Sequence, residues 1–293
     1  MMNNASLDAC YALRKQEVKN TIRDLYNNDN KIGKPIDIGE LSFSTLVCAI
    51  QNMLWGEALE LKEKGTTNLR AGLKFKLAEL MVLAGTPNIS DVFPMLSWLD
   101  IQELMQHPQV MKKVQEELAQ VVGMDSCVEE FHLSRLMYLD AVVKETFRLH
   151  PAVPLLLPRR ASESGNIGGY TIPKDTTLML NVWAIHRDPH LWDNPLEFRP
   201  ERFLNVGIES KFDYSGNNFQ YLPFGSGRRM CAGIPLAERM LMFVLASLLH
   251  SFEWELPTGT KLNLSEKFGI VIKKKEPLVA IPTPRLSNSE LYH

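Results

Sequence analysis

The chain contains little cysteine, and its cysteines do not stand in the patterns where they usually act together. There are four in 293 residues, and no two have a Cys-x-x-Cys spacing. This argues against a zinc site and against a disulfide framework, and it favours a reducing compartment. The net charge of −2 shows no acidic or basic excess. We therefore expect no nucleic-acid partner.

Long apolar runs, leader sequences and repeats are also lacking. The longest apolar run, from Met240 to Leu249, is shorter than a bilayer requires. The first residues show no signal-peptide pattern, and no internal repeat or low-complexity stretch is visible. With 293 residues, 45% of them hydrophobic, the chain can form one large core or two domains.

The chain does have a loop rich in glycine and arginine that ends in a cysteine, just before an apolar helix. Phe224, Gly227, Arg229, Cys231 and Gly233 form a Phe-x-x-Gly-x-Arg-x-Cys-x-Gly frame. A thiolate there is favoured by the positive end of the helix dipole and by the guanidinium charges, and the glycines let the backbone approach a flat ligand. These are the requirements of an axial thiolate on a heme iron. The alternative is a buried structural thiol.

The frame resembles the heme-binding signature of the cytochrome P450 family, and other motifs follow in the family's order. Glu145 to Arg148 matches its Glu-x-x-Arg, and Pro200 to Phe203 matches its Pro-x-Arg-Phe. Residues 131–154 and 181–189 are similar to plant microsomal members, with the monoterpenoid (geraniol) hydroxylase subgroup the most similar.

This resemblance implies a fold, a cofactor and a reaction. The fold would be mainly α with small β-sheets, and the cofactor heme b (iron protoporphyrin IX) with Cys231 as the metal ligand. The reaction would insert one oxygen atom of O₂ into a small apolar metabolite such as a terpenoid, using electrons from an NADPH-dependent reductase. The reductase is expected to dock near Arg228 and Arg229.

The resemblance also implies a location. Family members lie at the cytosolic face of the endoplasmic reticulum membrane. Met1 begins where the family already has its membrane anchor and first helices behind it. We therefore expect the anchor to be missing, and a cytosolic chain is the alternative.

Further residues are assigned to the heme and the substrate by resemblance. Arg229 and Arg159 are expected at the heme propionates, because a guanidinium can bind a carboxylate in a bidentate way. The cofactor-binding set is Cys231, Arg229, Phe224, Gly227, Gly233 and Arg159, and the substrate-contacting set is Val153, Leu155, Leu156, Phe268 and Ile270. The alternatives are a solvated surface arginine for Arg159 and ordinary core packing for residues 155–157.

Glu145 and Arg148 are expected on one face of a helix, because they are three residues apart in a segment with helical periodicity. An isolated pair of this kind is usually a solvated surface feature. By resemblance, Arg202 joins them in a buried cluster, where a carboxylate shared by two guanidiniums fixes geometry more than it adds stability. We expect these three residues to have a structural role, locking the segment that carries Cys231.

The chain departs from the family where the family activates oxygen. The oxygen-activating helix normally reads Ala/Gly-Gly-x-Asp/Glu-Thr, and the nearest string here is Ala84 to Asn88, with a proline in place of the acid and an asparagine in place of the threonine. Proline also interrupts a helix interior. No catalytic residue is therefore assigned. The family's Trp-x-x-x-Arg motif, which lies upstream of Glu-x-x-Arg, is missing too. Residues Trp183 to Arg187 match its pattern but lie downstream of Glu145.

An internal deletion explains this departure. Residues 83–102 resemble a family segment well before the oxygen-activating helix, and residues 103–108 resemble a segment after it. We therefore predict a deletion at the bond between Gln102 and Glu103, which removes that helix.

The predicted deletion divides one incomplete domain into two parts. Residues 1–102 form a helical fragment upstream of the deleted helix, and residues 103–293 form the heme-binding part. The resemblance is nearly continuous over 103–283. Two functions are open at this point: a heme-thiolate monooxygenase, or a non-catalytic truncated relic or splice form.

The remaining pattern predicts a mostly helical chain with a few short strands. Helices are expected over residues 7–26, 38–55, 108–122, 138–149 and 236–250. Strands are expected over 168–173, 176–182, 269–272 and 278–281, with the last two paired, and 195–203 is expected to be a proline-punctuated loop.

Overall fold

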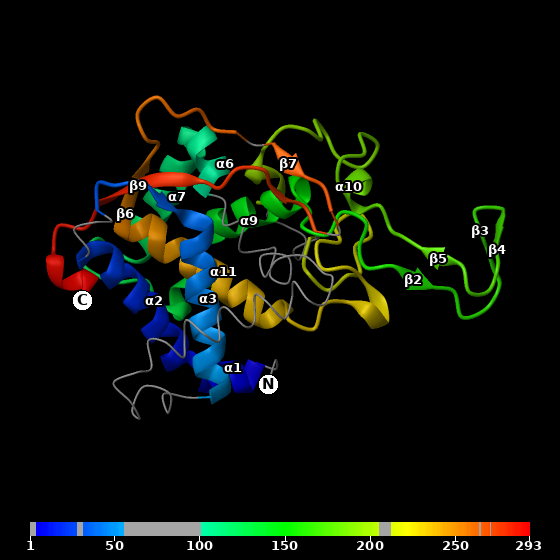
Figure 1. Cartoon of the computed structure of the whole chain (residues 1–293), viewed down its shortest axis with the longest axis horizontal. Helices are drawn as coiled ribbons and strands as arrows, with labels where there is room; N and C mark the ends of the chain where they lie inside the picture. Colours follow the sequence, from blue (N-terminus) through cyan, green and yellow to red (C-terminus); the bar gives the residue numbers. More distant parts are fainter. Residues whose placement is uncertain (1–3, 28–31, 56–100, 205–211, 264, 270) are drawn as a thin grey trace.

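The computed structural model describes residues 4–27, 32–55, 101–204, 212–263, 265–269 and 271–293. Helices form the body of the molecule, and two pairs of short strands extend from one side of it (Figure 1). The α-helices are α1 (Asn4–Ala9), α2 (Tyr11–Asn27), α3 (Ile38–Trp55), α6 (Ile101–Gln106), α7 (Pro108–Val121), α8 (Glu130–Leu133), α9 (Met137–Leu149), α10 (Val182–Ile185) and α11 (Ile234–Ser251). The 3₁₀ helices are η3 (Pro200–Phe203), η4 (Gly227–Arg229) and η5 (Ser289–Tyr292).

Helix α11 is the centre of the core. Gly233 is its N-cap and Pro235 lies in its first turn, where proline's missing N–H costs nothing. It is apolar on nearly all sides, so it is buried among α2, α7, α8 and α9. Among the described residues, α11 alone is long and apolar enough to cross a membrane, and 78% of it is buried within the fold, so it serves here as a core helix.

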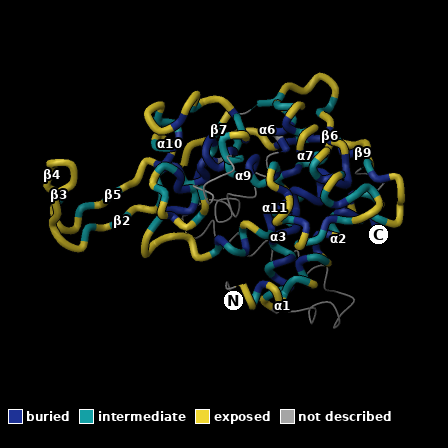
Figure 2. Tube along the Cα trace, turned by 180° about the vertical axis from the view of Figure 1, so that it is seen from behind, coloured by how far each residue is buried: buried dark blue, intermediate teal, exposed yellow. Residues whose placement is uncertain are grey.

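Helices α7 and α9 pack against this core, α7 by one face and α9 on nearly all sides. Pro108 opens α7, and Val110, Val114 and Leu118 form its buried stripe. Helix α9 is buried over most of its length, including the charged side chains of Glu145 and Arg148. Figure 2 shows α9 in the buried centre.

The strands form small antiparallel sheets. They are β1 (Ile36–Asp37), β2 (Arg159–Arg160), β3 (Gly165–Ile167), β4 (Tyr170–Ile172), β5 (Thr177–Leu178), β6 (Phe252–Glu255), β7 (Glu266–Lys267), β8 (Lys273–Lys274) and β9 (Val279–Pro284). β9 pairs with β1 on one side and β6 on the other, β2 pairs with β5, β3 with β4, and β7 with β8. The β2–β5 and β3–β4 pairs form the largely exposed arm in Figure 2.

Four expectations about the elements need correction. Cys10 separates α1 from α2 in the predicted helix 7–26. The predicted strand 176–182 shortens to β5, because the Asn181 side chain accepts the Ala184 N–H and caps α10. The predicted loop 195–203 ends in η3. The pairing of 269–272 with 278–281 is wrong: the described residues of 269–272 lie in the turn between β7 and β8.

Candidate functional site

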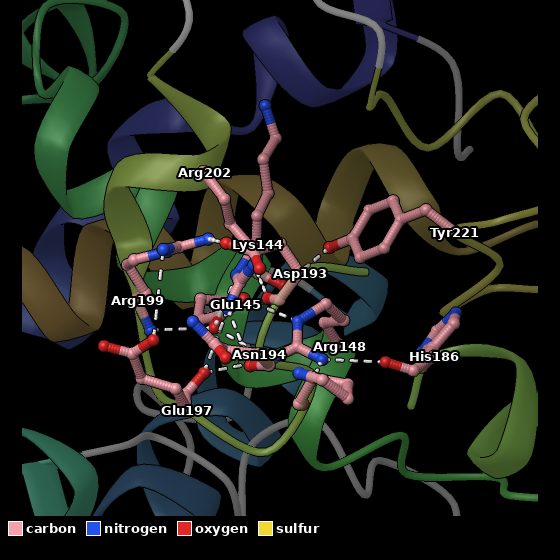
Figure 3. A network of polar contacts seen from close by, with 11 residues as sticks. Lys144, Glu145, Arg148, His186, Asp193, Asn194, Glu197, Arg199, Arg202 and Tyr221 are labelled. Carbon is pink, nitrogen blue, oxygen red and sulfur yellow. Dashed lines mark hydrogen bonds and ion pairs between the residues drawn. The ribbon is translucent and has the colours of Figure 1, made fainter. Parts of the chain in front are cut away.

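A carboxylate and two guanidiniums form a buried cluster that we call the anchor cluster: Glu145, Arg148 and Arg202. Glu145 and Arg148 are both 0% exposed. Arg148 Nε and Nη2 donate to Glu145 Oε2 and Oε1 at 2.7 and 2.9 Å, and Arg202 Nε donates to Oε1 at 3.1 Å. Figure 3 shows the two arginines converging on one carboxylate from α9 and η3. Each charge is thus paired and hydrogen-bonded, as burial requires.

The anchor cluster also binds the backbone between α10 and η3. Arg148 Nη1 donates to the carbonyl oxygens of His186 and Pro195, both at 2.7 Å. The remaining bonds run from Arg148 Nη2 to Glu197 O, from Arg202 Nη1 to Asp193 O, from Arg202 Nη2 to Asn194 O and Glu197 O, and from the Arg199 N–H to Glu145 Oε1. The cluster therefore fixes the path of a long irregular segment by donating to its carbonyl oxygens.

The cysteine lies at the end of an exposed loop, residues 224–233, that we call the ligand loop. The Cys231 thiol is exposed, and its backbone N–H donates to Phe224 O at 3.1 Å, which closes the loop on itself. Phe224 is buried and packs edge-on against Phe147 of α9, with ring centroids 5.5 Å apart. The buried start of the ligand loop is thus held to the helix that carries the anchor cluster.

A cavity of about 580 Å³ opens beside the thiol. Its lining includes Cys231 and Met230 of the ligand loop, Tyr214, and Glu238 of α11. Burial raises the pKa of the Glu238 carboxyl, and the nearby Asp140 carboxylate adds to the effect.

Two glycines near the ligand loop have positive φ, and one of them, Gly216, also permits a close approach of two backbone segments. Gly225 has φ +76°, and a Cβ built on it would lie 3.5 Å from Leu156 Cδ1 and 3.8 Å from Arg159 Nη2. Gly216 has φ +71°, and a Cβ there would lie only 2.7 Å from the Gly225 carbonyl oxygen. Arg159 Nη2 donates to Ser226 O at 3.0 Å. Arg159 is therefore held against the ligand loop.

His150 joins three elements near the β7–β8 turn. Its Nε2 lies 3.0 Å from Glu103 Oε1 of α6, and its Nδ1 lies 2.7 Å from Glu266 Oε1 of β7. Burial opposes ionisation of Glu103, but the bond and charge of His150, with Lys274 and His107, hold the pKa of that carboxyl below its usual range. These contacts hold the hairpin that carries Phe268.

A model of the cytochrome P450 family matches residues 81–281, which is more than half of the chain. A flavonoid 3'-monooxygenase of Petunia hybrida is 35% identical, over 98% of this chain and 72% of its own length. The chain belongs to the cytochrome P450 family. Members of this family are heme-dependent monooxygenases.

Other P450 relatives match the chain over a smaller share of their own length. A geraniol 8-hydroxylase of Swertia mussotii is 47% identical over 70% of this chain and 40% of its own length. An iridoid oxidase of Catharanthus roseus is 49% identical over 63% of this chain and 36% of its own length. The chain thus spans about two fifths of the length of these two relatives.

A solved structure shows the same fold. It is a zebra fish cytochrome P450 with abiraterone, with a TM-score of 0.70 and 24% identity. The match covers 94% of this chain and 78% of that one, so the chain has an incomplete P450 fold.

The residues present fit the heme that P450 proteins use. The donor set is one exposed thiol, Cys231, with Arg159 half-buried and Arg229 exposed as cations for carboxylates. Gly225, at φ +76°, carries no Cβ, and an added Cβ would make only ordinary contact with Leu156. This combination of thiolate donor, cations and bare backbone suits a flat, carboxylate-bearing iron ligand.

The structure also bears on the alternatives for single residues. The exposed Cys231 is not a buried structural thiol. Arg159 is not a freely solvated surface arginine, because it is half-buried and bonded to Ser226. Of the assigned substrate contacts, Val153, Leu155 and Leu156 are half-buried, whereas Phe268 is 69% exposed; the neighbouring Leu157 is also 69% exposed, so it is not packed in the core. Ile270 and residues 84–88 lie outside the described residues.

Sequence reasoning missed His186 and Gly216. His186 falls in a string that resembles plant P450 proteins, but neither periodicity nor charge marks its ring as a hydrogen-bond acceptor. Gly216 follows Tyr214 and Ser215 in an irregular segment. Its close approach to Gly225 depends on tertiary contacts that no local pattern reports.

Proposed function

We propose that the chain binds heme b, with the Cys231 thiolate as the iron ligand and Arg159 and Arg229 as partners of the propionates. One observation carries this proposal: an exposed thiol immediately before α11, on a loop whose buried start is packed on α9. The positive end of the α11 dipole favours a thiolate there. The exposed sulfur needs no rearrangement of the core to reach a ligand.

Each part of the chain has a distinct task in this proposal. Bound heme would supply oxygen-activating chemistry, which a thiolate ligand favours by donating electron density. Cys231 and the ligand loop hold the iron side, and Arg159 orients a carboxylate edge. The Ile272 N–H donates to Ala152 O at 2.9 Å, so residues 152–156 lie beside the β7–β8 turn. We propose that these apolar segments contact substrate and exclude water.

The substrate class follows from the relatives and from these apolar segments. Flavonoid and monoterpenoid hydroxylases both match the chain, so we propose a small apolar plant metabolite such as a terpenoid. Titration of the heme-loaded chain with geraniol and with a flavonoid, followed by the shift of the ferric Soret band, tests the choice. A shift with geraniol only supports a terpenoid, and a shift with the flavonoid only overturns it.

We further propose an NADPH-dependent reductase as electron donor, docking near Arg228 and Arg229 at the face of the ligand loop, with the exposed Arg228 as its contact. Charge reversal at Arg228 should slow heme reduction by the reductase and leave reduction by dithionite unchanged. If the reductase reduces the variant and the wild-type chain at equal rates, the docking site is contradicted. The site of action we propose is the cytosolic face of the endoplasmic reticulum membrane, where plant relatives act.

A second candidate is a chain that binds heme without turnover, favoured by one observation. The alignment with the Petunia relative is 373 residues long, whereas the chain has 293, so the relative contains internal segments without a counterpart here. We propose that the missing segment lies between Gln102 and Glu103. This bond lies inside helix α6, and Glu103 and Leu104 after it are buried. The fold can therefore accommodate the two segments joined at this point.

One pair of measurements tests both candidates. The reduced, carbon monoxide-bound spectrum of the full chain with heme should show a strongly red-shifted Soret band that Cys231→Ala abolishes. An ordinary heme band in both proteins would contradict thiolate ligation. Product formation with a reductase then separates the candidates: turnover supports the monooxygenase, and a thiolate band without turnover supports the heme-binding chain.

A further inference from the structure

His186 is a fully buried histidine that lies between the anchor cluster and the ligand loop. Its carbonyl oxygen accepts from Arg148 Nη1 at 2.7 Å (Figure 3), and its ring Nε2 accepts the backbone N–H of Leu222 at 2.9 Å. The ring also stacks on Tyr221, with centroids 5.5 Å apart and planes inclined by 24°. One residue thus contacts the cluster through its backbone and the start of the loop through its side chain.

The hydrogen bonds determine the protonation of this ring. Because Nε2 accepts from a backbone N–H, the ring proton of a neutral His186 sits on Nδ1. Burial, aided by the charge of Arg148, lowers the pKa of His186 to about 3. The backbone of Phe147 and Arg148 is close enough to this ring to oppose the lowering of its pKa in part.

The bond to Leu222 acts at the point where the chain turns into the ligand loop. Leu222 O accepts the Gly225 N–H at 3.1 Å, and Phe224 O accepts the Cys231 N–H at the same distance. The backbone from Leu222 to Cys231 is thus a short series of bonded turns. A displacement of Leu222 would move the carbonyl that holds the Cys231 backbone.

We propose that His186 is a positioning residue for the Cys231 thiolate. Its neutral ring accepts the Leu222 N–H and thereby holds the ligand loop at a fixed position relative to the anchor cluster. It does not touch the iron ligand. Its effect passes through the backbone of residues 222–231. The spectral part of the test rests on the proposed heme function, whereas the backbone part does not.

Two amide substitutions separate an acceptor from simple volume. In His186→Gln the side-chain oxygen reaches near the position of Nε2, and in His186→Asn it falls short, near Nδ1. His250 supplies the control, because it is also 0% exposed but bonds Ser126 O through Nε2 at the far end of α11. His250→Asn removes a buried imidazole of the same kind, remote from the loop.

The first readout is amide hydrogen exchange of the full chain without heme. We expect the Leu222 and Cys231 amides of His186→Asn to exchange about tenfold faster or more relative to wild type, as for loss of a buried hydrogen bond. His186→Gln should restore protection, and His250→Asn should leave both amides unchanged. Unchanged exchange in His186→Asn, or equal acceleration in His250→Asn, would overturn the proposal.

The second readout is the share of the red-shifted thiolate band in the reduced carbon monoxide spectrum. This share should fall in His186→Asn and recover in His186→Gln, with His250→Asn equal to wild type. A wild-type chain without the band contradicts the proposed heme function, and the exchange readout then still decides the role of His186. Should His186→Asn not fold, His186→Gln decides alone: a folded Gln variant without loop protection contradicts the proposal.

Discussion

The anchor cluster and the ligand loop meet solvent in opposite ways. In the cluster, both Glu145 and Arg148 are 0% exposed and every charge has a partner inside the chain. In the loop, Arg229 and Cys231 are exposed, and only the start of the loop, at Phe224, is buried. The comparison separates two tasks: buried charges fix where the loop starts, and exposed groups are left to meet a ligand. The predictions below test this division.

The largest effect is expected from breaking the cluster. Glu145→Gln leaves two buried guanidiniums without their shared carboxylate, so the free energy of unfolding should fall by about 3–5 kcal/mol. Glu116→Gln is the matched control, because Glu116 also pairs with a cation on its own helix, Lys112, but is 57% exposed. The control should change stability by no more than about 0.5 kcal/mol. Urea unfolding of both variants checks this, and equal losses would contradict the difference between buried and exposed pairs.

The next effect concerns the close approach behind the loop. Gly216→Ala and Gly259→Ala both place a side chain at positive φ, which costs about 1–2 kcal/mol. Only the Cβ at Gly216 meets a backbone oxygen, at 2.7 Å, whereas the Cβ at Gly259 meets nothing within 4 Å. We expect Gly216→Ala to lose about 1–3 kcal/mol more, since backbone atoms must shift. Thermal unfolding measures the difference, and similar midpoints for the two variants would show that the segments do not touch.

The buried link between the two regions should make stability depend on pH. The folded-state pKa of His186 is lowered to about 3, from 6.5, so the unfolded chain binds this proton first as the pH falls. Its contribution is complete above pH 6.5 and is lost toward pH 3, by up to about 1.4 kcal/mol per pH unit. His186→Gln should have a shallower acid slope than wild type in this window. Parallel slopes would mean that His186 titrates normally in the folded chain.

The smallest effect on stability is expected in the exposed part of the loop. Cys231→Ala should change the unfolding free energy of the chain without heme by no more than about 0.5 kcal/mol, because the thiol is exposed. The same variant should lose the stabilisation that added heme gives the wild-type chain. Thermal unfolding with and without heme measures both. A large loss without heme would place Cys231 among the structural residues.

Parts of both regions could be predicted from the sequence. Cys231, Glu145 and Arg148 stand in short motifs, and the 3.6-residue periodicity of 138–149 placed the last two on one helix, α9. The contribution of Arg202 came from a family resemblance, since nothing local brings residues 145 and 202 together. The bonds from Arg148 to the carbonyls of residues 186–197 could not be foreseen, because backbone acceptors carry no sequence signal.

The strands near the C-terminus show why the remainder was harder. Residues 269–272 are apolar, as a strand would be, yet the described residues Gly269, Val271 and Ile272 lie between β7 and β8, and the charged Glu266 and Lys274 form the flanking pair instead. Two-residue strands depend on contacts such as the bond between His150 and Glu266 more than on intrinsic preference. The break at Cys10 between α1 and α2 has no proline or glycine to mark it.

Iron X-ray absorption of the full chain loaded with heme tests the central claim most directly. A sulfur neighbour at the distance of a thiolate ligand in wild type, and its loss in Cys231→Ala, is the result that we predict. Only nitrogen and oxygen neighbours in the wild-type protein, or a sulfur signal that survives Cys231→Ala, would contradict the account.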